Sequence, residues 1–276
     1  MSRKTILITG CSSGIGYASA KMMRARGWRV FASCRKAEDC ARLEGEGFES
    51  PRIDYEDSGT IESGLAEVLA ATGGTLDALF NNGAYGIPAP VEDLPTDALR
   101  SIFEANFFGW HDLTRRVIPV MRAQGAGHIV QCSSVLGFVT MPWRGAYNAT
   151  KYALEGLTDT LRIEMRDTGI NVVLIEPGPI RTKIRENSIP HFEKWIDWKS
   201  SARKDEYQTG LLNKLYKGSD GAPFELESEA VAEKLWLALE DPTPRSHYMV
   251  TTPTYLMAIF RRFLPRPFLD KILARG

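Results

Sequence analysis

The sequence predicts a doubly wound α/β fold, in which one domain is built on a central parallel β-sheet. Short apolar runs alternate with longer segments of helical period, and the runs are apolar throughout, as in strands buried on both faces. The chain has 276 residues, of which 43% are hydrophobic and 25% charged, and this suits a single soluble domain spanning residues 1–276. Alternating β and α segments imply right-handed crossovers between parallel strands.

Five runs are expected to be strands and four segments to be helices. The strands are TILIT (5–9), RVFASC (29–34), LDALFNN (76–82), GHIVQCSS (127–134) and INVVLIEPG (170–178), and the helices cover 14–27, 58–72, 96–124 and 146–168. From about 185 to 225 the periodicity weakens, after the carboxyl end of a strand, where ligands bind in such sheets. This segment is expected to be a variable substrate lid. A helix should resume after Ser228, an expected N-cap.

The C-terminal extension, about residues 252–276, interleaves apolar residues with cations. The cations are Arg261, Arg262, Arg266, Lys271 and Arg275, and Pro265 and Pro267 interrupt any long helix. We expect the extension to pack over the substrate entrance or a subunit interface. It is also a candidate for weak peripheral membrane contact.

Composition argues against several classes of function. Lys+Arg and Asp+Glu both total 34, so no global field favours nucleic acid. The four cysteines form no CxxC pair and suit reduced thiols in a cytoplasmic protein. We expect no signal peptide, and no apolar run approaches the ~18 residues of a membrane span. The four histidines have no metal-ligand spacing, so no metal site is expected.

The stretch ILITGCSSGIG reads as a strand, a tight turn and the start of a helix. Gly10, Gly14 and Gly16 would let the backbone approach a pyrophosphate, and the helix start offers free N–H groups. The spacing differs from the G-x-G-x-x-G fingerprint. The glycines alone would equally suit a plain βα turn.

Tyr147 and Lys151 lie four residues apart in a helical run, so their Cβ atoms are about 5–6 Å apart on one face. A phenol has a pKa of about 10 and is a poor base at neutral pH. A nearby ammonium favours the tyrosinate, so the pair could transfer a proton. Without further context such a pair is more often structural.

Several motifs together supply that context. TGCSSGIG, NNGA, the serine pair before YNATK, and PGPIRT occur in an order and at distances that resemble the classical short-chain dehydrogenase/reductase family, over roughly residues 4–182. The likeness is greatest to its steroid and retinol dehydrogenase-like members. The resemblance implies a Rossmann-type fold and a nicotinamide cofactor. In NNGA the usual N-N-A-G is changed, which leaves the conformation of that loop open.

The resemblance assigns cofactor contacts residue by residue. The glycine turn would hold the diphosphate, Asp54 would meet the adenine edge, and the loop after the fifth strand would meet the nicotinamide carboxamide. The implied contacts are Gly10, Ser12, Ser13, Gly14, Ile15, Gly16, Asp54, Asn82, Gly83, Tyr147, Lys151, Pro177, Gly178, Ile180 and Thr182.

The end of the second strand indicates which cofactor. NAD sites usually place an acid there, but Cys34 takes its place and is followed by Arg35 and Lys36. A guanidinium can bind a 2′-phosphate bidentately. A solvated basic turn would look the same, but in this context we expect NADP(H).

The resemblance also assigns the chemistry. Tyr147 would be the general acid/base, and Lys151 would lower its pKa and hold the nicotinamide ribose. Ser134, rather than its neighbour Ser133, would polarise the substrate oxygen. Asn106 would hold a water of the proton relay near Lys151.

Large apolar residues are expected to line a pocket for a lipophilic alcohol, aldehyde or ketone. They are Tyr85, Val135, Leu136, Phe138, Met141, Trp143, Trp195 and Trp198. The expected activity is NADP-dependent oxidoreduction in a homodimer or homotetramer. A catalytically silent NADP-binding regulator on the same fold is the alternative. A nucleotide-sugar epimerase would need a longer C-terminal domain.

Overall fold

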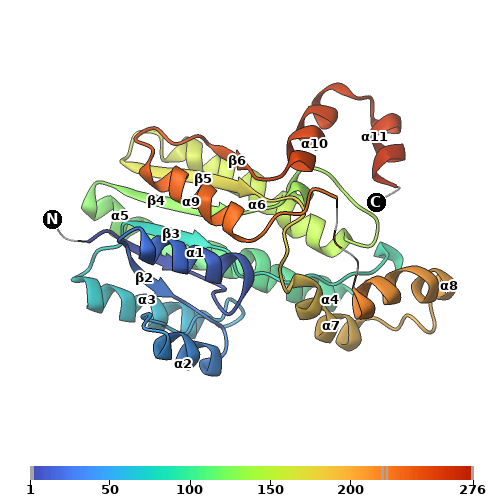
Figure 1. The fold of residues 1–276 in the computed structure, drawn as a ribbon, viewed down its shortest axis with the longest axis horizontal. Helices are drawn as coiled ribbons and strands as arrows, with labels where there is room; N and C mark the ends of the chain where they lie inside the picture. Colours follow the sequence, from blue (N-terminus) through green and yellow to red (C-terminus); the bar gives the residue numbers. More distant parts are fainter. Residues whose placement is uncertain (1–2, 219–220, 222, 275–276) are drawn as a thin grey trace.

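A six-stranded parallel sheet forms the centre of the computed structural model, which describes residues 3–218, 221 and 223–274 (Figure 1). The strands are β1 (Thr5–Ile8), β2 (Arg29–Ala32), β3 (Ala78–Asn81), β4 (Gly127–Cys132), β5 (Ile170–Glu176) and β6 (His247–Met249). They lie in the order β2-β1-β3-β4-β5-β6, and each neighbouring pair is parallel. The predicted doubly wound fold and its five predicted strands are confirmed.

Helices cover both faces of the sheet. On one face α1 (Gly14–Ala25) and α9 (Glu229–Glu240) run side by side (Figure 1), and α2 (Ala37–Gly45) continues that layer. On the other face lie α3 (Ser58–Thr72), α5 (Gly109–Gln124) and α6 (Gly145–Glu164). Each helix turns one apolar stripe to the sheet, so the core forms two layers that exclude water from the strands.

Several elements depart from the sequence prediction. The predicted helix 96–124 is divided into α4 (Thr96–Phe103), a π-helical segment (Glu104–Phe108) and α5. Both α2 and β6 were missed, because one is a short polar helix and the other has three residues. The lid is largely helical, with α7 (Ile184–Trp195), α8 (Lys204–Glu206) and π-helical segments Tyr207–Leu211 and Asn213–Lys217. Ser228 precedes α9, but its hydroxyl donates to the carbonyl oxygen of Arg181 (3.1 Å) instead of capping the helix.

The C-terminal extension forms α10 (Thr252–Phe263) and α11 (Arg266–Leu273), which stand out from the body of the domain (Figure 1). Pro265 separates them, as predicted. Arg275 lies outside the described residues. Among those described, no helix combines the length and the apolar character needed to cross a bilayer.

The parallel topology determines where the candidate site lies. The carboxyl ends of β1, β3, β4 and β5 meet at one edge of the sheet. The glycine turn follows β1, the NNGA loop follows β3, Ser134 follows β4 and the EPGPIRT loop follows β5. Motifs that are far apart in the sequence are therefore neighbours in space.

Candidate active site

The turn between β1 and α1 has a backbone that glycine adopts with least strain. Gly10 and Gly14 have φ angles of +68° and +56°. A Cβ atom on Gly10 would lie 2.6 Å from the Cα atom of Gly83, and one on Gly16 would lie 2.3 Å from the carbonyl oxygen of Gly10. The three glycines therefore hold the start of α1 close against the loop that follows β3.

The N-terminus of α1 carries no side-chain cap. Ser13 is the N-cap residue and has an extended backbone, but its hydroxyl makes no capping hydrogen bond, and the first turn contains no acidic residue. Backbone N–H groups at such an end, together with the helix dipole, attract phosphate. With Ser12 and Ile15 flanking this end, the residues present fit the diphosphate of a dinucleotide.

The exchanged NNGA loop is held by hydrogen bonds to β1. The backbone N–H of Asn82 donates to Thr9 Oγ1 (2.9 Å), and its side-chain Nδ2 donates to the Thr9 carbonyl oxygen (3.1 Å). Buried Asn81 donates to Thr114. A Cβ atom on Gly83 would come no nearer than 3.4 Å to Gly10. Position 83 therefore has room for alanine, and the exchanged order does not disturb the contact with the glycine turn.

The cation pair expected at the adenosine end lies on the surface. Arg35 and Lys36 are exposed and directly follow buried Cys34. Lys36 pairs with Glu38 at 3.5 Å, whereas in the described part of the chain Arg35 forms no ion pair within 4 Å. Asp54 is half-buried, and its Oδ1 accepts the backbone N–H two residues later at 3.1 Å. The guanidinium of Arg35 is thus available to an anionic ligand.

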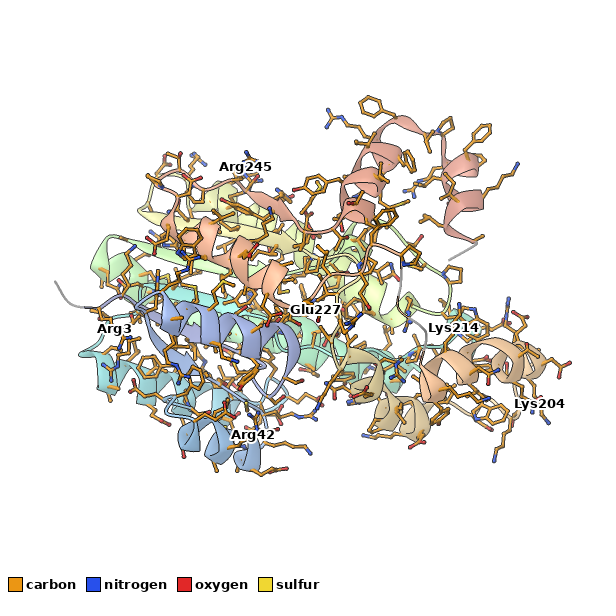
Figure 2. The ribbon with its side chains drawn as sticks, viewed as in Figure 1. Arg3, Arg42, Lys204, Lys214, Glu227 and Arg245 are labelled. Atoms are coloured by element: carbon orange, nitrogen blue, oxygen red, sulfur yellow. The ribbon has the colours of Figure 1, made fainter. Side chains whose placement is uncertain are left out.

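A second arginine, which no motif indicated, reaches this region from α2. Arg42 Nη2 donates to the carbonyl oxygen of Ser12 at 2.8 Å (Figure 2). Its guanidinium also pairs with Glu46 at 2.6 Å and lies 5.6 Å from the ring centre of Tyr17. The contact with Ser12 places a positive charge beside the glycine turn.

At the chemical end, Ser134 and Tyr147 are brought together. Ser134 Oγ accepts the backbone N–H of Leu136 (3.1 Å) and lies 3.5 Å from the carbonyl oxygen of Pro177. Burial raises the pKa of Tyr147 above its ordinary value, and the nearby hydroxyl of Ser134 only partly offsets this. The buried hydroxyl of Ser133 lies beside Glu155 and lowers the pKa of that carboxyl instead. Of the two serines, Ser134 is the one that meets the phenol.

Lys151 is fully buried between the tyrosine and α5. Its Nζ donates to the carbonyl oxygen of Cys132 at 2.8 Å, lies 4.1 Å from the ring centre of Trp110 and 5.6 Å from that of Tyr147. Burial lowers the pKa of Lys151 to about 8. The ammonium is therefore held by a carbonyl oxygen and an aromatic face, and no carboxylate of the described residues forms an ion pair with it.

Lys151 was expected to lower the pKa of Tyr147, but the protein groups around the phenol raise that pKa. Burial dominates and raises the pKa of the phenol, while the cation that opposes this is Arg144, at the start of α6. The sequence spacing showed the ammonium but could not show how deeply the phenol is buried.

Asn106 occupies the π-helical segment before α5 and is fully buried. Its Nδ2 donates to the carbonyl oxygen of Tyr85 (2.8 Å), and its Oδ1 accepts the Tyr85 N–H (3.1 Å). Nδ2 also lies 3.4 Å from Thr150 Oγ1, one residue before Lys151. The amide therefore fixes the loop after β3, and its part in a water relay stays a prediction.

The loop after β5 lies against both ends of the site. The carbonyl oxygen of Pro177 accepts the backbone N–H of Val135 at 2.8 Å, next to Ser134. A Cβ atom on Gly14 would lie 3.3 Å from the Cβ atom of Thr182. The loop thus connects the glycine turn with Ser134.

Gly178 and Ile180 lie on the inner side of this loop. A Cβ atom on Gly178 would lie 2.1 Å from Thr251 Oγ1, so only glycine fits. Ile180 packs on the core and pairs with Leu226. The next residue, Arg181, forms a 2.6 Å ion pair with Glu227.

On the substrate side, Tyr147 packs into an apolar cluster that the lid completes. The cluster contains four residues of the expected pocket, namely Tyr85, Trp143, Trp195 and Trp198. His191, on lid helix α7, stacks on Tyr85 with ring centres 3.6 Å apart, and burial lowers its pKa to about 4. A neutral imidazole therefore joins the lid to the loop after β3, a contact that the sequence did not indicate.

The remaining expected pocket residues lie elsewhere. Val135 and Phe138 pack under the C-terminal helices, and Leu136 accepts a hydrogen bond from Asn148. Met141 lines a groove of about 610 Å³, which Trp143 of the cluster borders together with Tyr152 and Arg266. Neither Tyr147 nor Lys151 lines this groove, which borders α6 on another side. The expected single pocket is therefore divided among three places.

An acidic cluster that the sequence analysis did not anticipate adjoins the site. Ligand atoms of Glu155, Glu176 and His247 lie within 4.8 Å of one another. Burial raises the pKa of Glu155 to about 7 and that of Glu176 to about 8. The histidine spacing could not reveal this group, because its members come from α6, β5 and β6.

The family model described as short chain dehydrogenase matches residues 4–192. The uncharacterized oxidoreductase YbbO of Escherichia coli is 39% identical over 98% of this chain and 94% of its own length. The NADPH-dependent 3-dehydrocapnine reductase of Ornithobacterium rhinotracheale is 32% identical over 96% and 94%. Human 17-beta-hydroxysteroid dehydrogenase type 1 is 29% identical over 96% and 80%. The chain is therefore an oxidoreductase of the short-chain dehydrogenase/reductase family.

Proposed function

We propose that this protein is an NADP-dependent oxidoreductase that interconverts a lipophilic alcohol and its aldehyde or ketone. The contact between Tyr147 and Ser134, with buried Lys151 beneath the phenol, is the observation that carries the proposal. NADPH, when bound, supplies the hydride. The protein then has to orient the carbonyl and deliver one proton to its oxygen.

Tyr147 delivers that proton. Because burial raises its pKa, the phenol is neutral at physiological pH and can donate to a carbonyl oxygen. Ser134 donates a second hydrogen bond to the same oxygen and stabilises the developing negative charge. Lys151 holds the ribose and supplies positive charge beside the tyrosinate that remains. Asn106 supports the return of a proton to this pair.

The preference for NADP rests on charge at the adenosine end. Arg35 is exposed without an ion-pair partner within 4 Å among the described residues, and Arg42 adds a second guanidinium beside Ser12. A 2′-phosphate gains charge-assisted hydrogen bonds from such groups, whereas a bare hydroxyl gains little. The NADPH dependence of the dehydrocapnine reductase supports this assignment.

The lipophilic substrate follows from the aromatic surroundings of Tyr147. Trp143, Trp195 and Trp198 contribute large apolar faces and few polar groups. The likeness to a hydroxysteroid dehydrogenase supports the same class. Exposed apolar side chains, Phe108 just before α5 and Leu157 and Ile163 on α6, support a homodimer or homotetramer. Four buried free thiols support a cytoplasmic location.

A screen of NADPH consumption with steroid, retinoid and aliphatic carbonyls tests the activity. We expect consumption with at least one lipophilic carbonyl and slower consumption with NADH. If NADPH binds but no carbonyl is consumed, the protein is better described as a silent NADP-binding regulator.

A further inference from the structure

We propose that α10 and α11 form a docking surface for an anionic lipid bilayer. Their inner sides are already occupied, because Leu269 and Leu273 pack on Phe138 and Val139, shortly after Ser134. The two helices therefore need no further apolar contact to be held against the domain.

Their outer sides are nevertheless apolar. Tyr255, Ile259 and Phe263 repeat every four residues along α10, and Phe268 and Ile272 do so on α11. Phe263 is 73% exposed and Phe268 60%. With Leu256, these make six of the fifteen large hydrophobic side chains that are exposed in the described residues, all within two short helices. A surface helix ordinarily has one apolar side, which packs on its own domain. The second, exposed apolar side of these two helices therefore indicates a partner.

Cations surround this apolar surface. Arg261, Arg262, Arg266 and Lys271 are all exposed, and Asp270 is the one acidic residue of the two helices. Within the described ranges none of the four cations takes part in an ion pair shorter than 4.0 Å. The segment is thus strongly basic in a chain whose formal charge is zero.

The positive charge of α10 and α11 indicates which partner binds their apolar surface. A two-fold contact with a second copy would bring the same cations face to face, which costs free energy. A bilayer that contains anionic lipids attracts the cations and accepts the aromatic side chains at its interface. The helices lack the length to span, so they would lie on the surface.

The position of the two helices supports this arrangement. They project from the domain, with side chains that extend away from its body (Figures 1 and 2). Arg266, at the start of α11, also lines the groove that Met141 and Trp143 form. When the protein is docked in this way, the mouth of this groove would lie at the bilayer surface. The inference does not depend on the proposed reaction.

Sedimentation with vesicles of phosphatidylcholine, with and without phosphatidylglycerol, tests the proposal without any substrate. We expect binding to the anionic vesicles that weakens with salt. Each of Arg261→Gln and Arg262→Gln should weaken it about fivefold. Leu256→Asp or Phe263→Asp should weaken it roughly tenfold or more.

Leu237→Asp on α9 is the matched control, because Leu237 and Leu256 are similarly exposed, at 43% and 42%. It should leave vesicle binding unchanged. Circular dichroism and sedimentation velocity verify the fold and mass of each variant. Absence of binding to anionic vesicles, or binding that the α10 variants do not alter, would overturn the proposal. So would a fall in oligomer mass in Phe263→Asp with vesicle binding unchanged, because the surface would then be a subunit contact.

Discussion

The ammonium of Lys151 lies 4.1 Å from the centre of the indole ring of Trp110. Both side chains are fully buried, and the indole Nε1 donates to the carbonyl oxygen of Gly83 at 2.9 Å. A cation over a desolvated aromatic face is stabilised by the ring quadrupole. Trp110 therefore favours the charged form of Lys151, against the burial that lowers its pKa.

Replacing Trp110 should change the pH dependence of carbonyl reduction. With the Lys151 pKa at about 8, kcat/KM should fall as pH rises above that value, because the ammonium is lost. Trp110→Leu removes the ring, so the fall should move to lower pH by about one unit. Trp110→Phe keeps a ring but loses the bond to Gly83, so it should lower Tm with a smaller shift. An unchanged profile in Trp110→Leu would show that the ring does not act on the ammonium.

Alanine should be tolerated at Gly83 in the NNGA loop but not at Gly10 in the glycine turn. Gly10→Ala combines a positive φ with a 2.6 Å approach to backbone, so NADPH affinity should fall at least about tenfold and Tm should drop. Gly83→Ala meets nothing closer than 3.4 Å and should stay near wild type. NADPH fluorescence titration and thermal unfolding measure both. Equal losses in the two variants would contradict the packing described here.

The exposed guanidinium of Arg35 should select the cofactor. Arg35→Asp should lower the ratio of NADPH to NADH affinity by about 10- to 100-fold, because it removes charge-assisted bonds and adds repulsion. Arg42→Ala should lower that ratio by less. Arg100→Ala, an exposed arginine on α4, controls for net charge. Titration of each variant with both cofactors gives the ratio, and no change in Arg35→Asp would remove the basis for the NADP assignment.

Buried Glu176 should make the protein less stable as pH rises. Burial, followed by the nearby Glu155 and Asp159 carboxyls, raises its pKa from 4.5 to about 8. The folded state therefore keeps a proton that the unfolded state releases. The free energy of unfolding is then highest below pH 4.5 and falls until about pH 8.

Glu176→Gln removes this titration, so it should flatten the pH dependence and raise stability at pH 8 by about 2 kcal/mol. Urea unfolding between pH 5 and 8 measures the slope. Glu164→Gln, an exposed change on α6, should leave the slope as in wild type. If Glu176→Gln keeps the wild-type slope, another group is responsible.

The sheet was predictable because its strands are buried on both faces and their apolar runs are unmistakable. Helix α2 was not predicted because it is short and polar, and strand β6 was not predicted because it has only three residues. The helical structure of the lid was not predicted, because it includes π-helical turns that break the 3.6-residue period on which helix prediction relies.

The candidate site was predictable where it follows linear motifs. Tyr147, Ser134 and the glycine turn could be named from motifs that resemble those of a known family, and the structure places Ser134 near Tyr147. Trp110, Arg42 and His191 could not, because their contacts depend on how separate elements pack. Of these three residues, only Trp110 had a signal in the sequence, namely its position four residues after Asn106. The pKa of Tyr147 was expected to be lowered because spacing reveals a neighbouring charge but not the depth of burial.

The central claim, that Tyr147 supplies the proton for an NADPH-dependent reduction, is tested most directly by Tyr147→Phe. NADPH affinity and steady-state NADPH oxidation are measured side by side, with a carbonyl that wild-type protein consumes. We predict that affinity stays within about twofold of wild type, because the other implied cofactor contacts are kept, while kcat falls by about 100-fold or more. Turnover at the wild-type rate in Tyr147→Phe would contradict the account.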